Sequence, residues 1–277
     1  MAAEASPSLG PAEPALFERR GDTLLPTDWS RGPWSHAMLH GGPVCGLAAA
    51  AVEDLAGDGL LCARMTVELH RPVGLDPITV ATRVVKPGRR ARVVDAEMTQ
   101  GGEVVARAMS QWVQPQGVQR DGVDGGRGPA PPPPVTTVVA GDDFDYPRPG
   151  FNCDAVEIAS VRGSTEESGP GQVWVRLAVP LVAGEPTSRW AATATLSDLV
   201  AAAAWEEAPG GGSFINADVT LQLNRLPAGE WMYLDARSHA SGGAVGFNEA
   251  LLADHLGPLG RVLQTVVQSP FEMPSRS

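Results

Sequence analysis

The same order of elements occurs twice in this 277-residue chain, and this repeat constrains the fold more than any other feature. In each half, an alanine-rich run of helical character is followed by alternating or β-branched runs that indicate strands. Between the halves, glycine, proline and polar residues replace apolar periodicity over 114–135. The sequence therefore predicts two similar units joined by a linker.

The first half is predicted to contain one buried helix over His40–Ala56, with two glycines at its start and Gly57 just beyond its end. Turns rich in Gly and Pro separate the runs that follow this helix. Four antiparallel strands are expected there, over Arg64–Pro72, Pro77–Val85, Ala91–Thr99 and Glu103–Val113.

The second half is predicted to repeat this order after a strand over Val173–Val182. Its alanine-rich helix is expected over Ala194–Ala208, with Ser197 and Asp198 near its start. Four further strands are expected over Ala217–Leu226, Trp231–Ala240, Val245–Ala253 and Gly260–Gln268.

Matching intervals support a duplication. The last alanine of the run lies 20 residues before Arg71 in one half and 21 before Arg225 in the other, and a turn glycine follows each arginine by 17 residues. A long helix followed by an antiparallel meander must bury its apolar sides against a curled sheet. The expected class is α+β: a tandem double hot-dog fold, two sheets each wrapped on a long central helix and packed as a pseudo-dimer.

The predicted organisation has four parts. A disordered tail over 1–14 is followed by an N-terminal hot-dog domain over 15–113 and by the linker over 114–135. A C-terminal hot-dog domain over 136–277 completes the chain.

Composition excludes several classes of protein. A net charge of −11 argues against a general nucleic-acid binder, which needs a basic face. Three cysteines without a CxxC pair indicate neither a disulfide framework nor a zinc site, and the histidines have no metal-ligand spacing. Neither a secretory signal nor an apolar run of about 18 residues is present. We expect a cytoplasmic protein without a membrane span.

Three motifs carry a resemblance to a known family: RGPWSHAMLHGGPVCGLAAAAVE in the first half, and VWVRLAVPLVAGEP and LSDLVAAAA in the second. They resemble the thioesterase-like double hot-dog proteins related to the acyl-CoA thioesterase II group, over roughly 16–268. The resemblance implies hydrolysis of acyl-CoA or a related thioester without a metal or an organic cofactor. It also implies association into a homo-oligomer.

The resemblance implies three site residues in the second half: an Asp on the helix, a Thr or Ser entering the next strand, and a Gln on the final strand. The first is Asp198, and the second falls at Asn216, where a carboxamide replaces the hydroxyl. The third is Gln264 or Gln268, because the preceding turn can be aligned in two ways. The ending GPLGRVLQ favours Gln264.

Thioester hydrolysis needs a base or nucleophile and donors for the oxyanion, and Asp198 can serve as either base or nucleophile. An Asp after Ser in a first helical turn also serves as a cap. The repeat and the resemblance favour the catalytic role. Because Cys45 occupies the equivalent position of the first half, we expect one active site per chain.

Five residues of the first half are candidates for substrate binding. His40 could orient the substrate beside Gly41 and Gly42, whose helix-start N–H groups could hold an oxyanion. A histidine before a helix also makes local backbone hydrogen bonds, and the glycines also permit close helix packing. Arg89 and Arg90, within KPGRRAR, could attract CoA phosphates or form a solvated turn.

The leading hypothesis is an acyl-CoA thioesterase in which Asp198 activates water. The second is a non-catalytic acyl-CoA or acyl-group binding protein, which the replacement of the hydroxyl by Asn216 favours. A hot-dog hydratase ranks last, because no DxxxxH segment follows a helix start.

Overall fold

The computed structural model describes residues 13–115, 148–163, 168–204, 213–240 and 245–269. Most of the expected tail and most of the expected linker therefore lie outside the described residues. The helical elements are the 3₁₀-helix η1 (Asp28–Ser30), α1 (Gly41–Ala56), the π-helix η2 (Phe151–Ala155), α2 (Arg189–Ser197) and α3 (Val200–Ala203).

Strands make up most of the regular secondary structure of the described residues. The first half contains β1 (Phe17–Arg20), β2 (Thr23–Pro26), β3 (Leu61–Leu69), β4 (Ile78–Lys86), β5 (Ala91–Gln100) and β6 (Glu103–Val113). The second half contains β7 (Val156–Arg162), β8 (Gly171–Leu177), β9 (Ser213–Asn216), β10 (Asp218–Leu223), β11 (Met232–Ala240), β12 (Val245–Asp254) and β13 (Gly257–Ser269).

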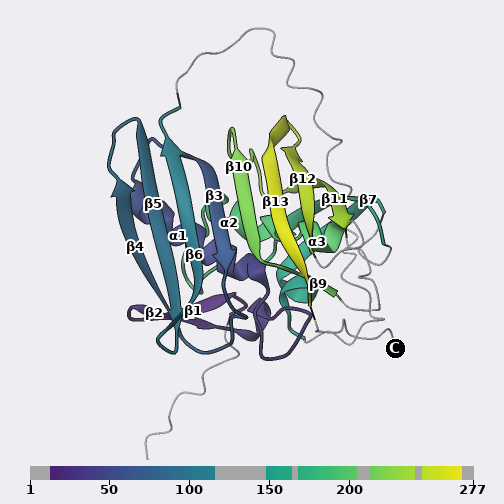
Figure 1. Cartoon of the computed structure of the whole chain (residues 1–277), viewed down its shortest axis with the longest axis horizontal. Helices are drawn as coiled ribbons and strands as arrows, with labels where there is room; N and C mark the ends of the chain where they lie inside the picture. The colour runs from purple at the N-terminus through teal and green to yellow at the C-terminus, as the bar shows by residue number, and fades with distance from the viewer. Residues whose placement is uncertain (1–12, 116–147, 164–167, 205–212, 241–244, 270–277) are drawn as a thin grey trace, which may run out of the picture.

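Across the described residues, the thirteen strands form one sheet in the order β1-β2-β4-β5-β6-β3-β10-β13-β12-β11-β8-β7, with β9 paired to β13. Figure 1 shows the strands of the first half beside those of the second. The halves join where β3 pairs antiparallel with β10, and Thr66 faces Thr220 there with 3.0 Å between their hydroxyl oxygens. On each side of this junction the strands follow one another in the same order.

The helix and the four strands expected in the first half are confirmed, with boundaries that differ by a few residues. The helix expected over Ala194–Ala208 is confirmed only in part: α2 and α3 are helical within 194–203, its start was placed too late, and 205–208 lie outside the described residues. Ser188 caps the true helix by accepting a hydrogen bond from the Ala191 N–H, so that α2 begins at Arg189 and ends at Ser197. Asp198 therefore lies at the end of α2. Hydroxyl groups near that end bond back to carbonyls of the helix, which favours termination.

Helices α1 and α2 run in opposite directions in close contact. A Cβ atom on Gly46 would lie 2.0 Å from the Thr195 hydroxyl oxygen, so only glycine permits this approach. Further along, the Trp190 indole N–H donates to the Ala49 carbonyl over 3.2 Å. This antiparallel packing brings the start of α1 to the end of α2.

The far ends of the two helices are joined by a polar contact. The Ser188 hydroxyl donates to the Glu53 carboxylate at 2.5 Å, and burial raises the pKa of Glu53. This contact joins the end of α1 to the start of α2. Asp198 lies at the opposite end of the helix pair.

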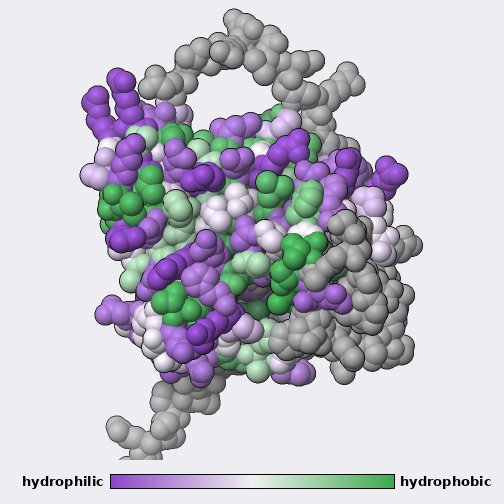
Figure 2. Space-filling view, in the orientation of Figure 1, coloured by the Kyte–Doolittle hydropathy of each residue, from purple (hydrophilic) through white to green (hydrophobic). Residues whose placement is uncertain are grey.

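The face of the sheet turned toward the viewer in Figure 2 mixes hydrophilic and hydrophobic side chains. Large apolar residues on the strands, including Met109, Phe247 and Leu263, remain about half exposed at 50%, 46% and 45%. A mixed, solvated face is usual for an antiparallel sheet that buries its other face. The core lies on the helix side, where most side chains of α1 and α2 are buried.

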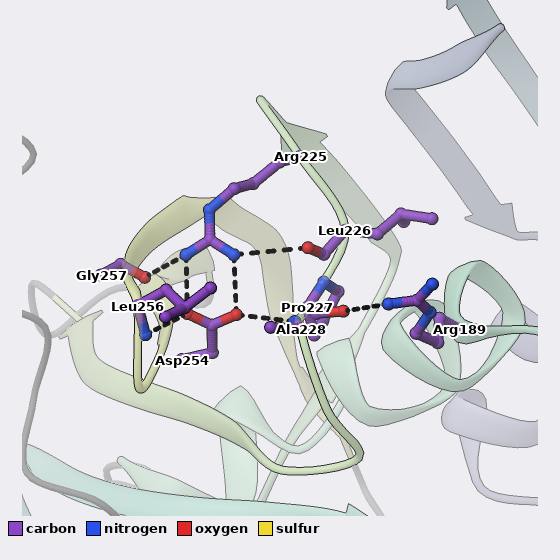
Figure 3. Close-up of polar contacts among 8 residues, drawn as sticks. All are labelled: Arg189, Arg225, Leu226, Pro227, Ala228, Asp254, Leu256 and Gly257. Atoms are coloured by element: carbon purple, nitrogen blue, oxygen red, sulfur yellow. Dashed lines mark hydrogen bonds and ion pairs between the residues drawn. The ribbon is translucent and has the colours of Figure 1, made fainter. Parts of the chain in front are cut away.

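A buried ion pair closes the end of the second half (Figure 3). Arg225 forms two hydrogen bonds of 2.6 and 2.7 Å with Asp254, which also accepts from the Ala228 and Leu256 N–H groups. Burial alone would raise the pKa of Asp254, but these hydrogen bonds hold it well below its usual range. The pair fixes the β12–β13 turn against the loop that follows β10.

None of the helices in the described ranges combines the length and the apolarity that a membrane crossing requires.

Candidate active site

Asp198 lies at the junction of α2 and α3, and its side chain is 2% exposed. A buried carboxylate requires hydrogen-bond donors or a positive partner, because desolvation disfavours an unpaired charge. The structure supplies such partners from three separate elements. The residues around Asp198 therefore form a hydrogen-bonded polar cluster within the core.

Two carboxamides bind the same oxygen of this carboxylate. Asn216, at the end of β9, donates from Nδ2 to Asp198 Oδ1 at 2.6 Å, and Gln264, in the middle of β13, donates from Nε2 at 3.1 Å. Gln264 is fully buried, and its amide also reaches the Asp198 carbonyl at 3.3 Å. Three residues proposed from the sequence thus converge at one point.

His40 approaches the other oxygen. It caps the start of α1, where its Nδ1 accepts from the Gly42 N–H at 3.0 Å and lies 2.9 Å from Asp198 Oδ2. The Phe151 ring packs on the imidazole with 4.7 Å between the ring centroids. The cap position and this aromatic contact hold the imidazole beside the carboxylate.

Gly41 and Gly42 permit this close approach. A Cβ atom on Gly41 would lie 2.6 Å from Asp198 Oδ2, and one on Gly42 would lie 2.6 Å from the Thr195 carbonyl. Among the described residues the Gly41 N–H has no hydrogen-bond partner, and Pro43 has no N–H. The start of α1 therefore offers a free donor beside the cluster.

The remaining predicted residues lie elsewhere. Gln268 is exposed near the end of β13, where it pairs with Phe214 of β9. Arg89 and Arg90 are exposed in the β4–β5 turn. The neighbouring Arg92 donates to the Ala56 carbonyl at the far end of α1, about 24 Å from its start by helical rise.

One residue of the cluster was not predicted from the sequence. Asn248 of β12 lies opposite Gln264 of β13, and its Nδ2 donates to the Gln264 Oε1 at 3.4 Å. This contact turns the Gln264 amide N–H groups toward Asp198. The available signal was a polar residue on the inward-facing side of an alternating strand, between Gly246 and Ala250.

Cys45, the expected counterpart of Asp198, is buried within α1. Burial raises the pKa of its thiol well above the ordinary value, and the Asp198 and Asp218 carboxylates raise it further. A neutral thiol of this kind is a poor nucleophile. Within the described residues, no group of three His, Cys, Asp or Glu side chains has an arrangement that could hold a metal ion.

Comparison with family models covers both halves of the chain. Residues 30–112 match the acyl-CoA thioesterase N-terminal domain, and residues 128–268 match the acyl-CoA thioesterase C-terminal domain. The chain belongs to the acyl-CoA thioesterase family. The resemblance expected from its motifs is confirmed.

Solved structures support the same fold for this family member. Acyl-CoA thioesterase II TesB2 from Mycobacterium marinum is 15% identical with a TM-score of 0.64, covering 91% of this chain and 93% of that chain. A protein of unknown function with a hot-dog fold from Alicyclobacillus acidocaldarius is 16% identical with a TM-score of 0.64, covering 91% and 95%. The fold is a hot-dog fold.

A curated relative, an uncharacterized protein from Mycobacterium tuberculosis, is 28% identical over 196 residues. The match covers 60% of this thioesterase-family chain. It spans 64% of the length of the relative.

Proposed function

We propose that this chain is a tandem double hot-dog thioesterase that hydrolyses an acyl-CoA or related thioester to a free acid and a thiol. The observation that carries the proposal is the convergence of Asp198, Asn216, Gln264 and His40 on one buried point from four separate elements. A carboxylate held at fixed geometry beside a helix start can supply both the base and the oxyanion donors that hydrolysis at a carbonyl uses.

The tandem arrangement is supported by the order of elements. In the first half α1 precedes the meander that starts at β3, and in the second half α2 and α3 precede the meander that starts at β10. The two helical segments pack antiparallel, as in an isologous pair. We further propose a cytoplasmic location and a homo-oligomeric assembly, on the family membership.

In the proposed reaction, Asp198 supplies the basicity that activates a water molecule. Asn216 and Gln264 hold its Oδ1, so that Oδ2 keeps one orientation toward the start of α1. Water attacks the thioester carbonyl, and the free N–H of Gly41 stabilises the oxyanion. The C–S bond then breaks, and the proton taken from water passes to the thiolate.

Hydrolysis of a panel of acyl-CoA thioesters, followed by release of free thiol, tests this function. We expect turnover by the wild type and a loss of about 100-fold or more in Asp198→Asn. The matched control is Asp54→Asn, which removes an exposed carboxylate on α1 and should retain full activity. Equal turnover by Asp198→Asn and the control would reject the site.

A second candidate function is acyl-CoA binding without turnover. It is favoured by the enclosure of Asp198, whose side chain is 2% exposed and whose two oxygens already have protein partners. Saturable binding of acyl-CoA by calorimetry, with no thiol released by the wild type over the whole panel, would support it.

A further inference from the structure

The imidazole of His40 has two nitrogens in different surroundings. Nδ1 is enclosed between the Gly42 N–H and Asp198 Oδ2. Nε2 has no hydrogen-bond partner among the described residues. Within that part of the chain, Nε2 is thus the ring nitrogen left for a water molecule or a substrate, on a side chain that is 10% exposed.

Nδ1 cannot satisfy both of its neighbours at once. To accept from the Gly42 N–H it must present a lone pair, and to bind the ionised Asp198 it must carry a proton. The two neighbours thus favour opposite tautomers. An ionised carboxylate at 2.9 Å stabilises a facing N–H more strongly than a backbone N–H stabilises a facing lone pair, since charge-assisted hydrogen bonds are roughly twice as strong.

The carboxylate is arranged as an orienting group. Asp198 Oδ1 accepts from both Asn216 and Gln264, so Oδ2 is the oxygen left for His40. Both oxygens of this buried carboxylate therefore already have protein partners. His40 offers a second basic nitrogen, Nε2, through which the charge of Asp198 can act.

We propose that Asp198 acts through His40: it holds the proton of the imidazole on Nδ1, and Nε2 is the base that removes the proton from the attacking water. This inference rests on the proposed function and assigns its base. As the water O–H bond breaks and the C–O bond forms, the proton moves to Nε2. When the C–S bond breaks, the same proton passes from Nε2 to the thiolate, and neutral His40 is restored.

The tautomer is measurable without any substrate. Nitrogen-15 NMR of histidine-labelled protein, with the His40 signals assigned by their loss in His40→Asn, reports which ring nitrogen carries the proton. We expect Nδ1–H in the wild type and Nε2–H in Asp198→Asn, where no carboxylate opposes the Gly42 N–H. An unprotonated Nδ1 in both proteins would overturn the proposal.

Two variants of His40 separate its proposed role as the base from its role as the N-cap of α1. His40→Asn keeps a good cap and a donor toward Asp198, and should lower kcat about 100-fold or more with unchanged thermal stability. His40→Gly keeps an acceptable cap and leaves space for added imidazole. Imidazole should restore its kcat in a saturable manner, and should not restore that of Asp198→Asn.

The outcomes distinguish this inference from the proposed function. If the wild type releases thiol and His40→Asn does so at the same kcat, His40 is not the base while the thioesterase proposal stands. If the wild type hydrolyses no thioester of the panel, the proposed function fails. The NMR comparison then still decides whether Asp198 sets the tautomer of His40.

Discussion

Asn216 donates from Nδ2 to Asp198 Oδ1 across 2.6 Å, while its own Oδ1 is buried without a partner in the described part of the chain. The carboxamide thus performs the donor function that a hydroxyl would perform at this position. The second hypothesis from the sequence, acyl-CoA binding without turnover, rested on the missing hydroxyl. The contact removes that ground, because a carboxylate needs a donor and an amide N–H is one.

Replacement of Asn216 tests this equivalence. Asn216→Leu keeps the size and removes the donor, and should lower kcat about 10-fold to 100-fold, since a buried charged acceptor loses about 1.5–3 kcal/mol. Asn216→Thr restores a hydroxyl donor and should remain within about tenfold of the wild type. Steady-state kinetics on one acyl-CoA substrate gives both values. A Leu variant as active as the Thr variant would contradict the role.

The two glutamines of β13 should behave differently. Gln264→Leu removes a buried donor to Asp198 and should lower kcat about tenfold or more. Gln268→Leu alters an exposed side chain and should leave kcat within about twofold. The two variants make the same substitution on one strand, and their kcat values are measured with the same substrate. A larger loss in Gln268→Leu would move the site toward the end of β13.

The sequence allowed the strands and α1 to be predicted because their alternation and helical periodicity are local properties. The start of α2 was not predicted because it lies before the alanine run and is set by the capping hydroxyl of Ser188, a single-residue signal without periodicity. Asp198 therefore has the expected neighbours, but it lies at the end of α2 and not near the start of that helix. The local pattern identified Asp198 as a site residue but assigned it to the wrong end of the helix.

The choice between Gln264 and Gln268 needed information that alternation does not contain. Both residues are separated by an even interval on one strand, so periodicity places them on the same face. Only the pairing of β13 with β9 and β10 decides which of them reaches Asp198. The same holds for Asn248, which reaches the site through its cross-strand pairing with Gln264.

Close packing of the two helices predicts a cost for a single methyl group. Gly46→Ala would place Cβ against the Thr195 hydroxyl and should destabilise the fold by about 1–3 kcal/mol, measured by urea unfolding. Thr195→Ala removes the closest obstacle. The double variant should therefore be more stable than the sum of the two single effects predicts. Simple additivity would mean that Thr195 does not limit this approach.

The role of Arg89 and Arg90 in CoA binding stays a prediction, because they are exposed in the β4–β5 turn, and the neighbouring Arg92 contacts the end of α1 that is remote from His40. If they attract the phosphates, Arg89→Glu with Arg90→Glu should raise KM for acyl-CoA about threefold to tenfold at low salt, with kcat unchanged. Arg162→Glu, on the exposed part of β7, is the control. A pantetheine thioester without phosphates should show no change. An equal rise in KM for both substrates would assign the effect to something other than the phosphates.

The Arg225–Asp254 pair predicts how the free energy of unfolding depends on pH (Figure 3). The pKa of Asp254 is lower in the folded protein than in the unfolded chain, so the unfolded chain binds this proton more readily. The stabilisation is therefore complete above the ordinary Asp pKa of about 4 and is lost progressively as pH falls below it.

Asp254→Asn should lower the free energy of unfolding at pH 7 by about 3 kcal/mol, the low end for a buried pair, because Arg225 is 33% exposed. The difference between variant and wild type should shrink as pH falls from 5 toward 3, measured by urea unfolding at each pH. Glu185→Gln is the control: it breaks the exposed Arg19–Glu185 pair, which is worth about 0–1 kcal/mol. A difference for Asp254→Asn that stays constant over this range would mean that the carboxylate charge contributes little, and that Asp254 acts mainly by packing.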